Sequence, residues 1–169
     1  MIIKNLTRRT ASFKQLLSYM MNGADTHDKN SFIIQHNIRD KQSIDNWVHA
    51  FKVNEVNRLH HRKDSIKLHH TVISFAKSDH AKISKDIAKD ITQKYLELRA
   101  GNTLAVAVAH SSQSHYHIHI MQAGVELFTG HSTRISKRQF ASIKKELQEY
   151  QLQKYPQLNN SIVQHGKKD

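Results

Sequence analysis

Alternation of histidine with large apolar residues is the strongest constraint on how this chain folds. Residues 110–121 read HSSQSHYHIHIM, in which His115, His117 and His119 are separated by single apolar residues. In a β-strand successive side chains point to opposite faces, so these three imidazoles would share one face. Imidazole is a common ligand of transition-metal ions and titrates near neutral pH, so this face is a candidate site for a metal ion or a phosphate. The alternative is a polar strand face that is rich in histidine by composition, since the chain has 14 histidines.

Composition predicts one folded domain over residues 1–169. Hydrophobic residues make up 38% of the 169 residues, and glycine and proline are few, which argues against disorder. The chain has no cysteine, which excludes disulfides, thiolate nucleophiles and Cys-type zinc sites. No apolar stretch approaches the roughly 20 residues of a membrane span, and no signal peptide is visible. We therefore expect a cytoplasmic protein without a membrane span.

The charge balance predicts a polyanionic partner. Lys and Arg total 26 against 14 Asp and Glu, for a formal net charge of +12. Such a positive field attracts nucleic acid first of all. A membrane surface is the competing partner, but no segment combines a strongly basic face with the large apolar residues of interfacial helices.

The spacing of apolar residues and cap residues predicts alternating strands and helices. Ser-x-x-Gln capping boxes at 12–15 and 136–139 precede helical stripes, as do Ser43 and Ser84. The expected helices end at residues 22–23, near 59, at 101 and before 156. The expected strands cover residues 1–6, 31–38, 68–75, 103–110 and 115–123. Together they predict an α+β fold, with a mostly antiparallel central sheet, the histidine motif on a central strand, and helices packed on the sheet.

Tyr19 is the candidate nucleophile outside the strands. It lies roughly 100° from the centre of the first helix's apolar stripe, at about 100° per residue, and so at the margin of the helix. A phenol is a weak nucleophile at its free pKa of about 10, but a nearby cation favours the phenolate. The alternative is an amphipathic tyrosine at the boundary of the core.

Three motifs in order resemble the relaxase and mobilisation nucleases of the HUH endonuclease superfamily, in particular its MobP-like group. SFKQLLSY at residues 12–19 resembles the first relaxase motif, which ends in the nucleophilic tyrosine. LHHTVISF at 68–75 resembles the second, and His110 followed by His117-Ile-His119 resembles the third, metal-binding motif. FTG at 128–130 and the Ser-capped basic helix after it match the usual continuation. The resemblance runs through nearly the whole chain, which ends without the long C-terminal extension common in such proteins, as a fragment or a minimal nuclease domain would.

This resemblance implies metal-dependent nicking and rejoining of single-stranded DNA at an origin of transfer. Tyr19 would attack the scissile phosphate, giving a 5′-phosphotyrosyl link and a free 3′-OH. A divalent ion, Mg²⁺ or Mn²⁺ or another transition metal, would be held by His110, His117 and His119. The expected protein partners are accessory mobilisation proteins and a coupling protein, and the expected state is a monomer. The candidate DNA contacts are Arg8, Arg9, Lys14, Lys137 and Arg138.

The chain departs from the family pattern two positions after the first motif histidine. Many relatives have an acidic residue there, whereas this chain has Ser112. The sequence therefore does not identify which residue transfers protons or donates hydrogen bonds to the metal ligands. The candidates for these roles are His115, His70, Ser112 and Ser74.

Hairpin geometry and the family resemblance favour different ligand sets. If residues 111–114 formed a simple four-residue loop, His110 would lie opposite His115, and His119 would be roughly 13 Å further along the strand pair. That hairpin favours His110, His115 and His117 as ligands. The resemblance favours His110, His117 and His119, which requires a wider loop, a bulge or non-neighbouring strands. We adopt the second set because three motifs match in order.

Two other functional classes fit parts of the sequence. HYHIHIM at residues 115–121 also fits the histidine-triad pattern of metal-free nucleotide hydrolases. That interpretation leaves the net charge and the first two motifs unexplained. A non-catalytic DNA-binding module with a vestigial metal site is the other alternative, and Ser112 is the residue that favours it.

Overall fold

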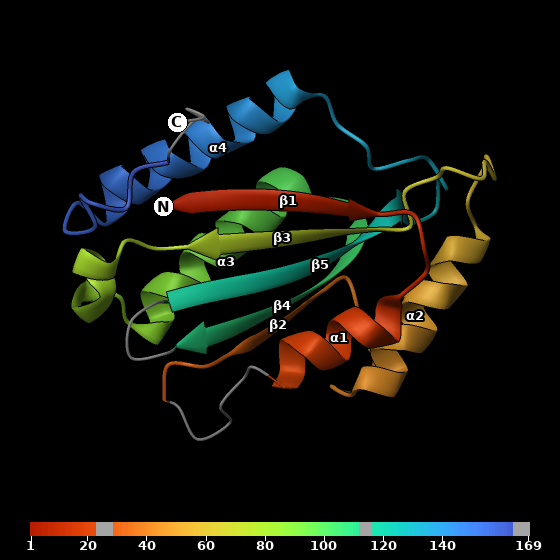
Figure 1. Ribbon diagram of the computed structural model, residues 1–169, viewed down its shortest axis with the longest axis horizontal. Helices are drawn as coiled ribbons and strands as arrows, with labels where there is room; N and C mark the ends of the chain where they lie inside the picture. The colour runs from red at the N-terminus through yellow and green to blue at the C-terminus, as the bar shows by residue number, and fades with distance from the viewer. Residues whose placement is uncertain (23–28, 112–115, 164–169) are drawn as a thin grey trace.

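The computed structural model describes residues 1–22, 29–111 and 116–163 of the chain. Its centre is a five-stranded sheet in the order β1-β3-β5-β4-β2, and every neighbouring pair is antiparallel (Figure 1). The histidine-bearing strand β5 therefore lies in the middle of the sheet, as expected. The strands are β1 Ile2–Arg8, β2 Ile33–His36, β3 Leu68–Ser74, β4 Thr103–Ser111 and β5 Tyr116–Glu126.

The helices begin where the serine caps predict. Ser43, Ser84 and Ser136 each accept a hydrogen bond from a backbone N–H of the first helical turn, and Ser136 completes its capping box with Gln139. A short 3₁₀ helix, η1 Lys77–Lys82, follows β3 and was not predicted. The α-helices are α1 Phe13–Asn22, α2 Ile44–Val56, α3 Lys85–Arg99 and α4 Lys137–Lys154.

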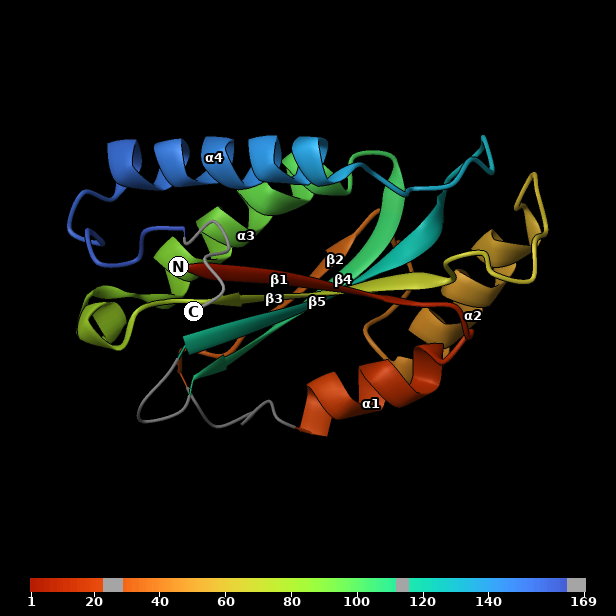
Figure 2. The ribbon, with the colours of Figure 1, turned by 45° about the horizontal axis from the view of Figure 1, so that its top comes forward.

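The helices form one layer on each side of the sheet. Figure 2 shows α3 and α4 on one side and α1 and α2 on the other. The buried stripe of α1 packs, together with α2, on Val106, Val108 and Met121 of the sheet. The other face of the same strands, with Ala107 and Ile118, packs on α3 and α4. Both faces of β4 and β5 are thus buried over most of their length, which explains their nearly continuous apolar sequence.

Helix α2 ends three residues earlier than predicted. Its last residue is Val56, and the N–H of Asn57 turns back to the carbonyl oxygens of Asn54 and Glu55. Glu55 at this end forms an ion pair with Arg58, with 2.6 Å between Oε1 and Nε. The apolar periodicity continues to residue 59, but the N–H of Leu59 donates to the distant carbonyl of Gly130 at 3.0 Å and not to a carbonyl of the helix.

The register of the simple hairpin between β4 and β5 is wrong. His110 pairs with His117, and Ser111 pairs with Tyr116, so four residues still connect the strands, but the connection lies one residue later in the chain than assumed. Alternation sets which face a side chain occupies, but not where the turn lies, so the register could not follow from alternation. Ser112 and His115 lie outside the described residues.

Candidate active site

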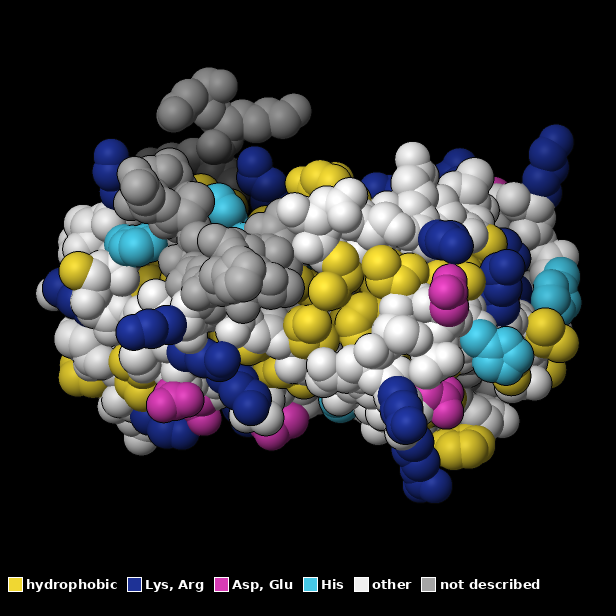
Figure 3. Space-filling model, turned by 90° about the horizontal axis from the view of Figure 1, so that it is seen from below, with side chains coloured by type: hydrophobic (Ala, Val, Ile, Leu, Met, Phe, Trp, Pro, Cys, Tyr) yellow, Lys and Arg dark blue, Asp and Glu magenta, His cyan; other side chains and the backbone are white. Residues whose placement is uncertain are grey.

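The candidate site occupies the part of the sheet face that α1 only partly covers. Its floor comes from three adjacent strands, and Tyr19 overhangs it from the last turns of α1. A hollow of about 310 Å³ opens there, lined by Ile2, Lys4, Tyr19, Val72, Ser74, His117 and His119. On the face seen from below, Lys and Arg side chains are spread around a central band of hydrophobic side chains (Figure 3).

The strand register brings the three motif histidines together. Because His110 lies opposite His117, His119 is only one strand repeat further along, about 6.8 Å by strand geometry. The ring centroids of His110 and His119 are 4.7 Å apart, and those of His117 and His119 are 6.5 Å apart. The long separation between His110 and His119 that the simple hairpin implied is therefore absent, so His110, His117 and His119 can form one set.

Tyr19 lies against this cluster. Its ring meets the ring of His119 edge-on with 5.5 Å between centroids, and the ring of His70 with 6.2 Å. The side chain is 56% exposed, while Leu16, Leu17 and Met20 of the same helix are buried. The predicted position at the helix margin is thus confirmed, and the phenol is open to a large substrate.

Strand β3 holds the outer nitrogen of two histidines. Nε2 of His70 is 3.0 Å from Nδ1 of His119, and Oγ of Ser74 is 3.1 Å from Nδ1 of His117. Such hydrogen bonds fix the orientation and tautomer of imidazoles that bind metals. With Nδ1 held by β3, each ring would bind an ion through Nε2.

Burial keeps His119 and His70 neutral at physiological pH. Burial first, and the charges of the neighbouring His110, His70 and His117 after it, lower the pKa of His119 to about 4. Burial also lowers the pKa of His70, with a smaller contribution from the charge of Arg8. A neutral imidazole has the free electron pair that a metal ion needs.

The donor set fits a divalent transition-metal ion after one ring turns. As the side chains stand, no group of three metal-ligating residues in the described chain converges on one point. Nε2 of His110 is instead 2.5 Å from the carbonyl oxygen of Met20. Turning this ring toward His119 would complete a set of three nitrogen donors. Imidazole nitrogens are common ligands of divalent transition-metal ions.

The candidate DNA-binding residues fall into two groups. Arg8 ends β1 near His70 and donates from Nη1 to Oγ of Ser12, 3.2 Å away. Lys14 starts α1, where its ammonium is 3.4 Å from an exposed carboxylate oxygen of Asp45. Arg9 is also exposed at this end of the chain. Lys137 and Arg138 begin α4, which covers the opposite face of the sheet, so the structure does not bring them to the histidines.

Sequence reasoning missed Lys4. This side chain lines the hollow beside Tyr19, because Lys4 on β1 pairs with Val72 and Val72 pairs with His119. Lys4 and Arg8 lie an even number of residues apart on β1 and so face the same side. Placing β1 next to β3 would have identified Lys4 beside the already predicted Arg8.

A family model for the nuclease domain of MobA/VirD2-like relaxases matches residues 19–155 of the chain. The chain belongs to this family. The match covers the expected histidine motif, so the relaxase interpretation replaces the histidine-triad one. A comparison with curated protein sequences finds no match.

Solved structures of another relaxase domain share the fold. A Mn-bound structure of the MobM relaxase domain (MOBV; Mob_Pre) with plasmid pMV158 oriT DNA is 14% identical, with a TM-score of 0.64 over 98% of this chain and 89% of that chain. A second MobM structure, bound to 26-nucleotide pMV158 oriT DNA, is 16% identical, with a TM-score of 0.60 over 98% of this chain and 90% of that one. These likenesses establish the relaxase fold. In the described part of this relaxase domain, no helix is long and apolar enough to cross a membrane.

Proposed function

We propose that this relaxase domain nicks and rejoins one strand of DNA at an origin of transfer, with Tyr19 as the nucleophile. The observation that carries the proposal is the contact of Tyr19 with the histidine cluster, where its ring lies 5.5 Å from that of His119. An exposed phenol beside neutral imidazoles suits attack on a phosphodiester. The basic residues Lys4 and Arg8 on β1 supply positive charge for the DNA backbone.

The reaction is a transesterification in which one phosphorus–oxygen bond replaces another. The phenolic oxygen of Tyr19 bonds to the phosphorus, and the bond from phosphorus to the 3′ oxygen breaks. The phenol proton passes to water, because the one unprotonated nitrogen of His70 accepts the hydrogen bond from Nδ1 of His119, and the 3′ oxygen takes up a proton as it leaves. The reverse reaction rejoins the strand without a nucleotide cofactor, because the phosphotyrosyl bond conserves the phosphodiester energy.

His110, His117 and His119 would hold the divalent ion. When bound, the ion supplies positive charge that stabilises the non-bridging oxygens as negative charge develops. The protein's own part is to set the rings in place. Ser74 and His70 hold two of them from β3, and Tyr19 is held over the cluster by the buried stripe of α1.

Tyr19→Phe tests the nucleophile. Single-stranded oligonucleotides tiled across the DNA that flanks the coding sequence are incubated with the protein and Mn²⁺, and protein-linked DNA is sought on denaturing gels. We expect a covalent adduct with the wild-type protein and none with Tyr19→Phe, while single-strand binding stays nearly intact. The matched control is Tyr155→Phe, whose hydroxyl donates to Asp90 on the α3–α4 side of the sheet and which should still form the adduct.

Two other outcomes would change the proposal. An adduct that persists in Tyr19→Phe would move the nucleophile to another tyrosine. DNA binding by the wild-type protein without any adduct, with or without a chelator, would favour the non-catalytic DNA-binding module.

A further inference from the structure

The turn after β5 presents an aromatic ring to solvent at a backbone position that disfavours it. Phe128 is 92% exposed, the highest fraction among the large hydrophobic residues described. Its φ is +64°, in the left-handed region, where a non-glycine side chain costs on the order of 1 kcal/mol or more. Neither burial nor backbone preference favours a phenylalanine here, which makes contact with a ligand the interpretation to test.

Phe128 forms one wall of a preformed pocket of about 630 Å³. We call it the Phe128 pocket, and it is lined by Asn37, Ile38, Arg39, Asp40, Ala50, Asn102, Leu104, Leu127 and Phe128. Two hydrogen bonds hold the turn in place: the Asn102 amide donates to the Leu127 carbonyl at 3.0 Å, and the Leu127 N–H donates to the Asn102 carbonyl at 2.8 Å.

The opposite wall is also held in place, at the other described non-glycine residue with a positive φ. Asn37 has a φ of +59°, and its amide donates to the carbonyl oxygens of Gly101 and Thr103, both at 2.9 Å. This contact fixes the start of the segment that carries Arg39 and Asp40. The pocket therefore exists before any ligand binds, which lowers the entropy cost of binding.

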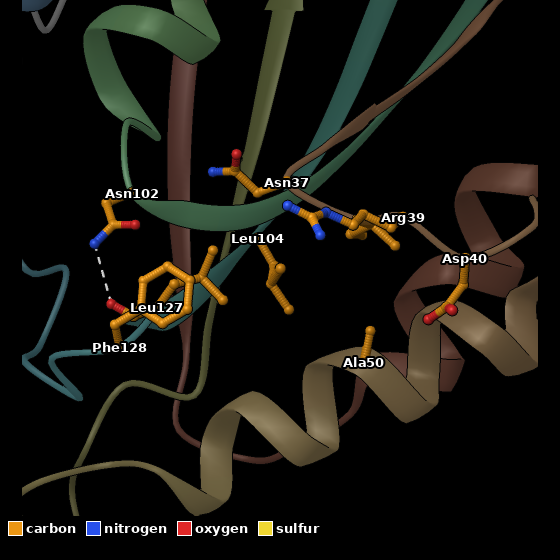
Figure 4. A pocket seen from close by; sticks show the side chains of 9 residues that line it. Asn37, Arg39, Asp40, Ala50, Asn102, Leu104, Leu127 and Phe128 are labelled. Carbon is orange, nitrogen blue, oxygen red and sulfur yellow. Dashed lines mark hydrogen bonds between the residues drawn. The ribbon is translucent and has the colours of Figure 1, made fainter.

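The pocket combines two flat groups with an apolar floor. Figure 4 shows the Phe128 ring and the Arg39 guanidinium on opposite sides, with Leu104 between them. Leu104 is buried and Ala50 of α2 closes the lower side. An aromatic ring and a guanidinium plane are the two side-chain surfaces on which nucleobases stack. Asp40 at the rim adds a carboxylate that can accept from a base amino group.

We propose that the Phe128 pocket binds one unpaired nucleobase of single-stranded DNA, stacked on Phe128 and facing Arg39. The inference rests on the proposed function, which brings a single strand to this chain. Leu104 and His110 lie six residues apart on one face of β4, about 20 Å by strand geometry. The bound base would therefore belong to a nucleotide away from the scissile phosphate. This site would add affinity without taking part in the chemistry.

The test separates bases from phosphates. Fluorescence anisotropy would compare an oligothymidylate with an abasic strand that has the same number of phosphates. We expect the wild-type protein to bind the oligothymidylate more tightly. Phe128→Ala should weaken oligothymidylate binding by about 5-fold to 150-fold, the range for loss of one stacked base, and leave binding of the abasic strand unchanged. Phe128→Trp should retain the preference for bases.

Two control variants exclude a folding artefact. Phe128→Gly removes the ring and relieves the positive φ, so it should weaken oligothymidylate binding without lowering the melting temperature. Ile162→Ala removes a half-exposed apolar side chain that does not line the pocket and should bind like the wild type. If the wild type and Phe128→Ala bind the oligothymidylate equally well, the Phe128 pocket does not bind a base, and the proposed function is unaffected. Failure of the wild type to bind either strand would overturn both.

Discussion

Acid should destabilise this protein through His69, which faces away from the candidate site. The side chain is 2% exposed, and its Nε2 is 3.1 Å from the hydroxyl oxygen of Thr133. That hydroxyl donates its only hydrogen to the carbonyl of Ala123, so Nε2 of His69 must be the donor to Thr133. Nδ1 is then the unprotonated nitrogen, and it is buried without a hydrogen-bond partner in the described residues.

Protonation of His69 would create a buried cation with an unpaired N–H beside Arg99. Burial first, and the charge of Arg99 second, lower the pKa of His69 to about 3. In the unfolded chain the pKa is about 6.5, so the unfolded state binds more protons between these two values. The free energy of unfolding therefore falls as pH drops below about 6.5. Between pH 7 and pH 5 this one group should remove about 2 kcal/mol, at about 1.36 kcal/mol per pH unit once the unfolded histidine is fully titrated.

The matched variant for this effect is His69→Gln, which keeps an amide donor for Thr133 but does not titrate. Urea unfolding of both proteins at pH 7, 6 and 5 gives the difference in free energy of unfolding at each pH. That difference should shift against the wild type by about 2 kcal/mol from pH 7 to pH 5, while titration of the other histidines cancels between the two proteins. A difference that stays constant with pH would refute the assignment of a neutral, buried His69.

Three further predictions concern the site, the DNA and the fold. His119→Ala should abolish metal-dependent cleavage. His115→Ala should keep the cleavage rate within about tenfold of the wild type, because His115 would at most contact a metal ligand and not the metal itself. If instead His115→Ala abolishes cleavage and His119→Ala keeps it, the ligands are the set favoured by the simple hairpin, His110, His115 and His117. Single-strand affinity should fall steeply with salt, with a slope of about −0.7 per phosphate contact in a plot of log affinity against log salt, and a flat plot would argue against a phosphate interface. Gly130→Ala should lower the free energy of unfolding by about 2 kcal/mol or more in thermal melts, since φ is +66° and a β-carbon would overlap the carbonyl oxygen of Asn57. Gly101→Ala, with φ of +37° and open space around it, should cost less, and equal losses would show that the overlap is relieved cheaply.

Local signals in the sequence predicted the elements well. Helix starts depend on a serine hydroxyl and the first turn of backbone N–H groups, so Ser43, Ser84 and Ser136 could be found from neighbouring residues alone. Face assignments were also local: the buried stripe of α1 and the half-exposed position of Tyr19 follow from helical periodicity.

Properties that depend on distant segments could not be predicted in the same way. The register that places His110 opposite His117 depends on the position of a turn, and the role of β3 depends on β5 pairing with it. His69 and His70 are neighbours in sequence, but only the arrangement of the sheet decides that His70 meets His119 while His69 meets Thr133. The Phe128 pocket needs α2, β4 and the segments that follow β2 and β5 at once, and periodicity within one segment contains no information about it.

The central position of β5 has a consequence for the nascent chain. Strand β5 is the last of the five strands to be synthesised, yet it is the only neighbour that β3 and β4 share. Before it inserts, the pair β1–β3 and the pair β4–β2 have no strand between them, and closing such long loops is the slow part of folding. His70 and His119 are 49 residues apart in the chain, so they meet only at this step. A chain in which β5 has not yet inserted would thus carry Tyr19 without His117 and His119 in place near it.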